Sequence, residues 1–318
     1  MKKHIYTILL IALALSLSNC STPYKAVPKL GKMDEMQYKH EVKKVFLPRS
    51  GYSIAYTDEG KGEKTIIFIH GLGSYLQAWK KNVETLKSNY RCISIDLPGY
   101  GKSSKEPHSG QMTFYASIID EISQELKLGQ VYLAGHSMGG QIAITTVLKY
   151  PSLVKGLILV DPAGFEPFHK GQKQWFRNVM TVDGVRLTTP EAIQNNLASN
   201  FYRLPDDADF MITDRLAMRS AVDFEAYCYA VVQSVHGMVD NPVIDYLQEI
   251  NVPTLIFFGE NDNLIPNRFL NPGKTVNIAK SGANKIKGSK LVMVPKCGHF
   301  MMFEKADVFN NEVISFLK

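Results

Sequence analysis

The sequence contains little cysteine and tryptophan, no arginine-rich block and no internal repeat, although it is 318 residues long. Beyond Cys20, the cysteines are widely spaced and odd in number (Cys92, Cys228 and Cys297), which is not the pattern of a disulfide framework. Cys297 lies two residues before His299, but no CxxC or Cys/His ligand spacing accompanies it. No metal and no cofactor is therefore predicted.

The net charge of +6 is modest, and its lysines are not interleaved with aromatic residues. Such a distribution is typical of a solvated face and argues against nucleic-acid binding. The composition, with 45% hydrophobic and 21% charged residues, is that of an ordinary globular protein. The length allows one large domain with an insertion, or two domains.

The N-terminus has the layout of a secretory signal. Lys2 and Lys3 precede an apolar run over residues 5–17, which is too short to span a bilayer comfortably. The following LSNC resembles a bacterial lipoprotein box, although Asn19 departs from the usual small residue before the cysteine.

The resemblance implies a signal peptide over residues 1–19, lipid attachment at Cys20 and a tether over residues 20–40. The protein would be exported and held at a membrane surface of the cell envelope by acyl chains. Plain secretion and an uncleaved anchor are the alternatives.

The remaining chain alternates apolar runs with helical patterns. The runs expected to form strands cover residues 44–48, 52–57, 65–70, 91–96, 131–136, 156–161, 253–259 and 290–295. Helices are expected over residues 77–88, 112–126, 138–150 and 306–317. This alternation predicts an α/β fold with a mostly parallel sheet flanked by helices.

One interval, residues 164–251, lacks a convincing strand pattern. We therefore predict that it forms a helical cap over the carboxyl edge of the sheet. The core is then formed by residues 41–163 and 252–318. Most of the aromatic and methionine side chains of the cap are expected to pack against the core, and a few to face a pocket. They include Trp175, Phe176, Met180, Phe201, Phe210, Met211, Met218, Phe224, Tyr227 and Met238.

The stretch GHSMGG over residues 135–140 follows a strand and opens a helix, which is the context that gives a G-x-S-x-G pattern meaning. The turn would expose Ser137 as a nucleophile, which needs a base and an acid to orient that base. His299, in the loop after the last strand, is the candidate base. Glu260 and Asp262 are the candidate acids; they lie in the loop that follows the predicted strand over residues 253–259.

Five motifs in order resemble the α/β-hydrolase fold family with a helical cap: HGLG at 70–73, DLPGYGKS at 96–103, GHSMGG, GENDNLIP at 259–266 and CGHF at 297–300. The resemblance covers roughly residues 43–318 and implies an eight-stranded sheet with the cap after the sixth strand. It also implies Asp262 as the acid and His299 as the base, with Asp161 as a rival acid used in some relatives.

In the same family the oxyanion of an acyl intermediate is bound by two backbone N–H groups, which here would be those of Leu72 and Met138. His70, His136 and Asp96 are expected to serve structure instead, by packing or by bonding to nearby backbone.

The nucleophile selects among the chemistries of the family. Ser137 argues against epoxide hydrolases and haloalkane dehalogenases, which use aspartate there. Hydrolysis of a carboxylic ester, including an acyl lipid, is the leading interpretation, ahead of acyl transfer, peptidase or perhydrolase activity.

A carbon–carbon bond hydrolase of ring-cleavage diketones is the alternative. However, those enzymes usually carry Asn where His136 stands and a Gly-Pro pair after the HG motif. An inactive, membrane-tethered binding module is the non-enzyme alternative.

Lipid attachment can be tested by growing cells with labelled palmitate. The wild-type protein is expected to take up the label and the Cys20→Ala variant to lose it, because that thiol would carry the acyl chain. Label that persists in Cys20→Ala would show that Cys20 is not the site.

Overall fold

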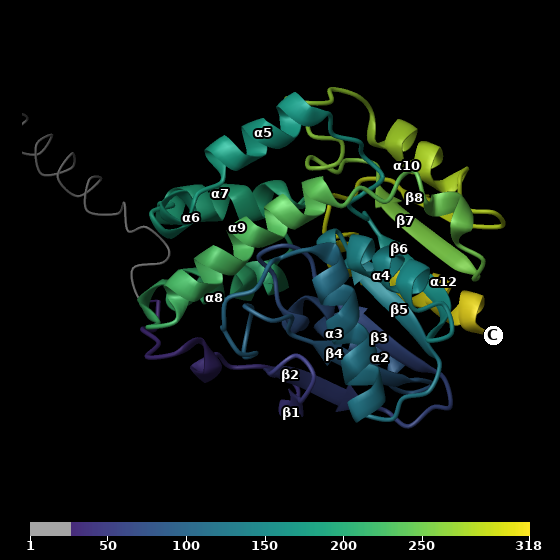
Figure 1. Ribbon diagram of the computed structural model, residues 1–318, viewed down its shortest axis with the longest axis horizontal. Coiled ribbons are helices and arrows are strands. Elements are labelled where there is room, and N and C mark those ends of the chain that lie inside the picture. Colours follow the sequence, from purple (N-terminus) through teal and green to yellow (C-terminus); the bar gives the residue numbers. More distant parts are fainter. Residues whose placement is uncertain (1–26) are drawn as a thin grey trace, which may run out of the picture.

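A sheet of eight strands crosses the centre of the computed structural model, which describes residues 27–318 (Figure 1). The strands are β1 (Lys43–Leu47), β2 (Tyr52–Glu59), β3 (Thr65–Ile69), β4 (Arg91–Ile95), β5 (Val131–His136), β6 (Val154–Val160), β7 (Thr254–Gly259) and β8 (Lys290–Val294). Their order across the sheet is β1-β2-β4-β3-β5-β6-β7-β8. The pairs β1–β2 and β2–β4 are antiparallel and the other five neighbouring pairs are parallel, so the predicted, mostly parallel sheet is confirmed.

Helices cover both faces of the sheet, which explains why its inner strands are almost wholly apolar. In β3 every residue is buried: Ile66 and Phe68 pack with α2 and α12, whereas Ile67 and Ile69 face α3 and α4. The helices of this core are α2 (Lys80–Leu86), α3 (Met112–Glu125), α4 (Met138–Lys149), α10 (Thr275–Ala283), α11 (Met301–Glu304) and α12 (Ala306–Leu317). Short 3₁₀ turns are η1 (Met33–Glu35), η2 (Leu76–Trp79), η3 (Asp206–Ala208), η4 (Met218–Ser220) and η5 (Leu247–Glu249).

A helical cap stands between β6 and β7, as the sequence predicts. It comprises α5 (Lys170–Val179), α6 (Val182–Arg186), α7 (Pro190–Ser199), α8 (Asp209–Ala217) and α9 (Phe224–Asp240). Local chemistry defines where α7 begins: the Thr189 hydroxyl accepts the N–H of Ala192, and Pro190 occupies the first turn of the helix.

Helix α9 joins the cap to the core. Ser234 Oγ lies 2.8 Å from the hydroxyl oxygens of both Tyr100 and Tyr115, and all three residues are buried. The backbone of Gly110 comes so close to α9 that a Cβ on Gly110 would lie 2.2 Å from the carbonyl carbon of Gln233. The cap is thus packed tightly onto the core along this helix.

The segment before residue 41 departs from the sequence prediction. Residues 27–40 were expected to belong to the tether between the membrane and the domain, but Met33 and Met36 are buried in the main core. The N–H of Met33 donates to Asp223 of the cap, and the hydroxyl of Tyr38 donates to buried Asp96 at 2.8 Å. The tether prediction is wrong for this part, because the two methionines have apolar surface to cover.

The predicted signal peptide, Cys20 and the start of the tether lie outside the described residues. Within residues 27–318, no helix combines the length and the apolar character that crossing a membrane requires.

The packing of the N-terminal segment predicts a stability effect. Met33→Ala removes a fully buried side chain and is expected to cost about 2 kcal/mol of unfolding free energy. Lys32→Ala, at the exposed neighbouring residue, should change little. Urea unfolding of both variants measures this; equal stabilities would mean that the segment is a tether after all.

Candidate active site

The strand-to-helix turn between β5 and α4 holds Ser137 in an unusual backbone conformation, with φ of +52° and ψ of −117°. A non-glycine residue in such a region costs on the order of 1–3 kcal/mol, which the surroundings must offset. Glycines make the turn possible: a Cβ on Gly139 would lie 2.3 Å from the carbonyl oxygen of Ile69. Ser137 is partly exposed among buried neighbours, so its hydroxyl is available.

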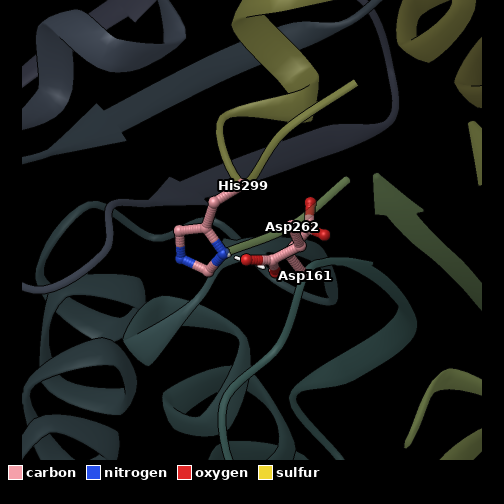
Figure 2. Close-up of side chains that lie close together, drawn as sticks. All are labelled: Asp161, Asp262 and His299. Atoms are coloured by element: carbon pink, nitrogen blue, oxygen red, sulfur yellow. Dashed lines mark hydrogen bonds and ion pairs between the residues drawn. The ribbon is translucent and has the colours of Figure 1, made fainter. Parts of the chain in front are cut away.

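His299 follows β8, and its ring is oriented by Asp262, which follows β7. The Nδ1 of His299 lies 2.8 Å from Asp262 Oδ2, and both side chains are buried (Figure 2). The other carboxylate oxygen, Oδ1, accepts the N–H groups of Leu264 and Ile265 at 2.7 and 3.1 Å. The Nδ1–H tautomer that donates to Asp262 leaves Nε2 as the basic nitrogen of His299.

The two rival acids are placed differently. Glu260 is exposed, whereas Asp262 and His299 are buried, and no hydrogen bond of the described residues joins Glu260 to either of them. Asp161 follows β6 and is fully buried beside Asp262, but its Oδ1 accepts the N–H of Gly259 and not the imidazole. In the described part of the chain Asp161, Asp262 and His299 form the one cluster with metal-ligand geometry, and there the histidine is already bonded to Asp262.

The loop after β3 lies against Ser137, the candidate nucleophile, where an oxyanion hole would be. A Cβ on Gly71 would lie 3.1 Å from the Cβ of Ser137, which brings Leu72 to the same corner. Met138 is the first residue of α4, so its N–H has no partner within the helix. Leu72, Ser137 and His299 line one cavity.

Two further histidines, His70 and His136, are buried and contact backbone groups of neighbouring loops. His70 Nδ1 lies 2.8 Å from the carbonyl oxygen of Gly71, and its Nε2 accepts the N–H of Leu97, as expected of a residue that holds the oxyanion loop. Burial lowers the pKa of His70 to about 4.

His136 Nε2 lies 2.9 Å from the carbonyl oxygen of His299. Burial, together with the nearby His299, lowers the pKa of His136 well below its usual value. His136 is therefore bonded to the backbone of the loop that carries His299, and burial disfavours its charged form.

Asp96 also serves structure, as predicted. Its Oδ1 accepts the N–H of Leu76 at 2.7 Å, and its Oδ2 accepts the N–H of Lys102 at 2.8 Å. The carboxylate thus ties the loop after β4 to the loop after β3.

The cavity over Ser137 has a volume of about 370 Å³, within the size range of small-molecule sites. Its walls are mainly apolar and come largely from the cap. Cap residues named from the sequence that line it are Phe176, Met180, Met211, Met218 and Met238.

Six further polar residues that line the cavity were not singled out from the sequence. They are Gln141, Glu166, Asn196, Asn200, Arg215 and Asn267. Arg215 bonds through Nη2 to the carbonyl oxygen of Gly73, and its guanidinium lies over the Tyr227 ring at 5.1 Å. A cation from the cap is therefore fixed next to the oxyanion loop.

Comparison with known proteins shows which family this architecture resembles. The model of the alpha/beta hydrolase fold family matches residues 64–306. A curated relative, the 2-hydroxy-6-oxononadienedioate/2-hydroxy-6-oxononatrienedioate hydrolase 1 of Pseudomonas putida, is 28% identical over 275 residues, 83% of this chain and 92% of the relative.

Among solved structures, the esterase EaEST from Exiguobacterium antarcticum is similar with a TM-score of 0.73 and 25% identity, over 87% of this chain and 99% of that one. A "probable hydrolytic enzyme" from Pseudomonas aeruginosa PAO1 has a TM-score of 0.80 and 24% identity, over 92% and 99% of the two chains. The second likeness supports the fold alone.

The placement of Ser137 predicts that a fluorophosphonate reagent will label the protein at this residue. Ser137→Ala should lose the label and reduce hydrolytic turnover by ~10⁶-fold, because the hydroxyl that would form the acyl intermediate is removed. Ser199→Ala, at an exposed serine of α7, serves as the control and should label like the wild type. Equal labelling of the Ser137→Ala variant would exclude Ser137 as the nucleophile.

Proposed function

The chain belongs to the alpha/beta hydrolase fold family, and we propose that it hydrolyses carboxylic esters of apolar acids through an acyl-enzyme on Ser137. The observation that carries this proposal is the position of Ser137, which lines a mainly apolar cavity together with His299. A buried Asp262 orients that histidine at 2.8 Å.

The acylation step follows from this geometry. His299 Nε2 accepts the proton of Ser137 as Oγ attacks the ester carbonyl carbon, and Asp262 stabilises the imidazolium that forms. The backbone N–H groups of Leu72 and Met138 bind the negative carbonyl oxygen of the tetrahedral intermediate. His299 then returns the proton to the leaving alcohol oxygen as the C–O bond breaks.

Deacylation repeats the same proton path with water. His299 Nε2 accepts a proton from the water as its oxygen attacks the acyl carbon, and the proton passes to Ser137 Oγ when the acid leaves. No group other than the three side chains and the two N–H groups is required.

The cavity supports an apolar acyl chain. Burial of each methylene group of a ligand against the aliphatic and aromatic lining stabilises the complex by roughly 0.8 kcal/mol. A polar chain would instead lose its hydration there. With about 370 Å³ available, the site suits an acyl group of limited length or part of a lipid. Met180, Met211, Met218 and Met238 offer flexible walls that adapt to such chains.

Carbon–carbon bond hydrolysis of an acidic diketone is the second candidate. The name of the Pseudomonas putida relative denotes a dicarboxylate substrate. Arg215, a guanidinium in the cavity beside the oxyanion loop, would suit a substrate carboxylate. Against it, His136 occupies the position where Asn is usual in that group and is bonded to the backbone of His299.

We also propose that Cys20 anchors the protein to a membrane of the cell envelope. The basic start, the apolar run and the LSNC stretch support this placement. An anchored enzyme would meet lipid esters at the surface that contains them.

Two substrate classes separate the candidates. We expect p-nitrophenyl esters with neutral, apolar acyl chains to have a higher kcat/KM than a vinylogous 1,5-diketone dicarboxylate. A diketone that is hydrolysed far better than every ester would establish the second candidate instead.

Arg215→Gln sharpens this comparison. Loss of a charged contact should lower kcat/KM about 10- to 100-fold for an anionic substrate and much less for a neutral ester. The ratio of the two effects is the readout, because Arg215 also bonds to Gly73 and its loss can affect both substrates. An equal loss on both would show that Arg215 serves only the loop.

A further inference from the structure

A second buried carboxyl group lies beside the acid of the proposed triad. Asp161 follows β6, is completely buried, and has a φ of +41°. Its Oδ1 accepts the N–H of Gly259 at 2.9 Å, whereas no donor in the described residues reaches its Oδ2. Buried carboxylate oxygens are rarely left without a donor, so this one calls for an explanation.

The neighbour of Asp161 is Asp262. One oxygen from each carboxyl group and one ring nitrogen of His299 lie within 4.8 Å of one another, and Figure 2 shows Asp161 directly beside Asp262. Two ionised carboxylates at such a distance in a buried site would repel strongly, whereas one shared proton turns the contact into a hydrogen bond.

The surroundings favour a single negative charge. Burial, and then the charge of Asp262, raise the pKa of Asp161 well above its usual value. Besides Asp262 and His299, the titratable groups that face it are Glu304 and the buried thiol of Cys297, and neither of these two supplies a positive charge. Hydrogen bonds stabilise the negative charge on Asp262, because its carboxylate accepts two backbone N–H groups as well as the N–H of the imidazole.

We propose that Asp161 is a positioning residue and a reserve acid of the site: its neutral carboxyl donates a hydrogen bond to Asp262, and it takes over the partnership with His299 when the Asp262 carboxylate is removed. This proposal rests on the proposed function. In the second state Asp161 releases its proton to solvent and accepts the Nδ1–H of His299, so that no other reactant is needed. A movement of about 2 Å brings the oxygen into hydrogen-bond distance.

Asn is the matched substitution for separating this role from a structural one. Its side-chain oxygen can still accept the N–H of Gly259, its NH₂ can still donate to Asp262, and Asn tolerates a positive φ as Asp does. It cannot ionise. A purely structural Asp161 would therefore be replaced by Asn with the same small effect in any background.

The test is a double-mutant cycle on kcat/KM for a p-nitrophenyl ester. We expect Asp161→Asn to stay within about threefold of the wild type and Asp262→Ala to lose about 100-fold. The double variant should lose ~10⁴-fold, as expected when the triad has no acid. If Asp161→Asn costs the same factor in both backgrounds, Asp161 is not a reserve acid.

Glu260→Gln in the Asp262→Ala background is the matched control. Glu260 is an exposed acid on the same loop, so its loss should leave the residual activity unchanged. A large loss there would mean that Glu260, and not Asp161, supports the variant.

Infrared difference spectroscopy tests the neutral carboxyl without relying on the folding or activity of Asp262→Ala. At neutral pH the wild type should show the C=O stretch of an un-ionised carboxylic acid that disappears in Asp161→Asn. Coincident spectra in this region would overturn the proposal. Failure of the proposed function would be seen separately, as a wild type that neither hydrolyses esters nor is labelled by a fluorophosphonate.

Discussion

The tight packing of the turn at Ser137 against β3 is the constraint on which the rest of the site depends. The carbonyl oxygen of Ile69 leaves no room for a side chain at Gly139, so α4 begins directly beside the end of β3. Because of this approach, the loop with Leu72 and the first N–H of α4 lie at the same corner as the serine. The strain of the positive φ is offset by the strands and helices packed around it.

Three buried histidines, His70, His136 and His299, have different roles at the carboxyl edge of the sheet. His70 joins the loops after β3 and β4, and His136 joins the turn after β5 to the loop after β8. Both are kept neutral by burial, so each presents one donor and one acceptor without a charge. Only His299 has a carboxylate partner within its reach, and this makes it the one suited to accept a proton.

The cap and the core are linked through backbone contacts as well as apolar surface. Glu304 accepts the N–H of Gly298, in the loop that carries His299, and those of Tyr202 and Arg203 in the cap. Arg215 links α8 to the oxyanion loop at Gly73. The cavity therefore lies between two parts held in register. The cap supplies most of its walls, and Ser137, Asp262 and His299 follow the ends of strands of the sheet.

Local patterns determined the strands, the cap and the candidate nucleophile, because runs such as TIIFI and the glycines around Ser137 express their structure within a few residues. The sequence also indicated His299 and Asp262 by their places after successive strands. It did not determine that residues 27–40 pack onto the domain, that Arg215 enters the cavity, or that Asp161 meets Asp262. Those contacts join distant parts of the chain, and only the order of strands and the path of each loop decide which side chains meet.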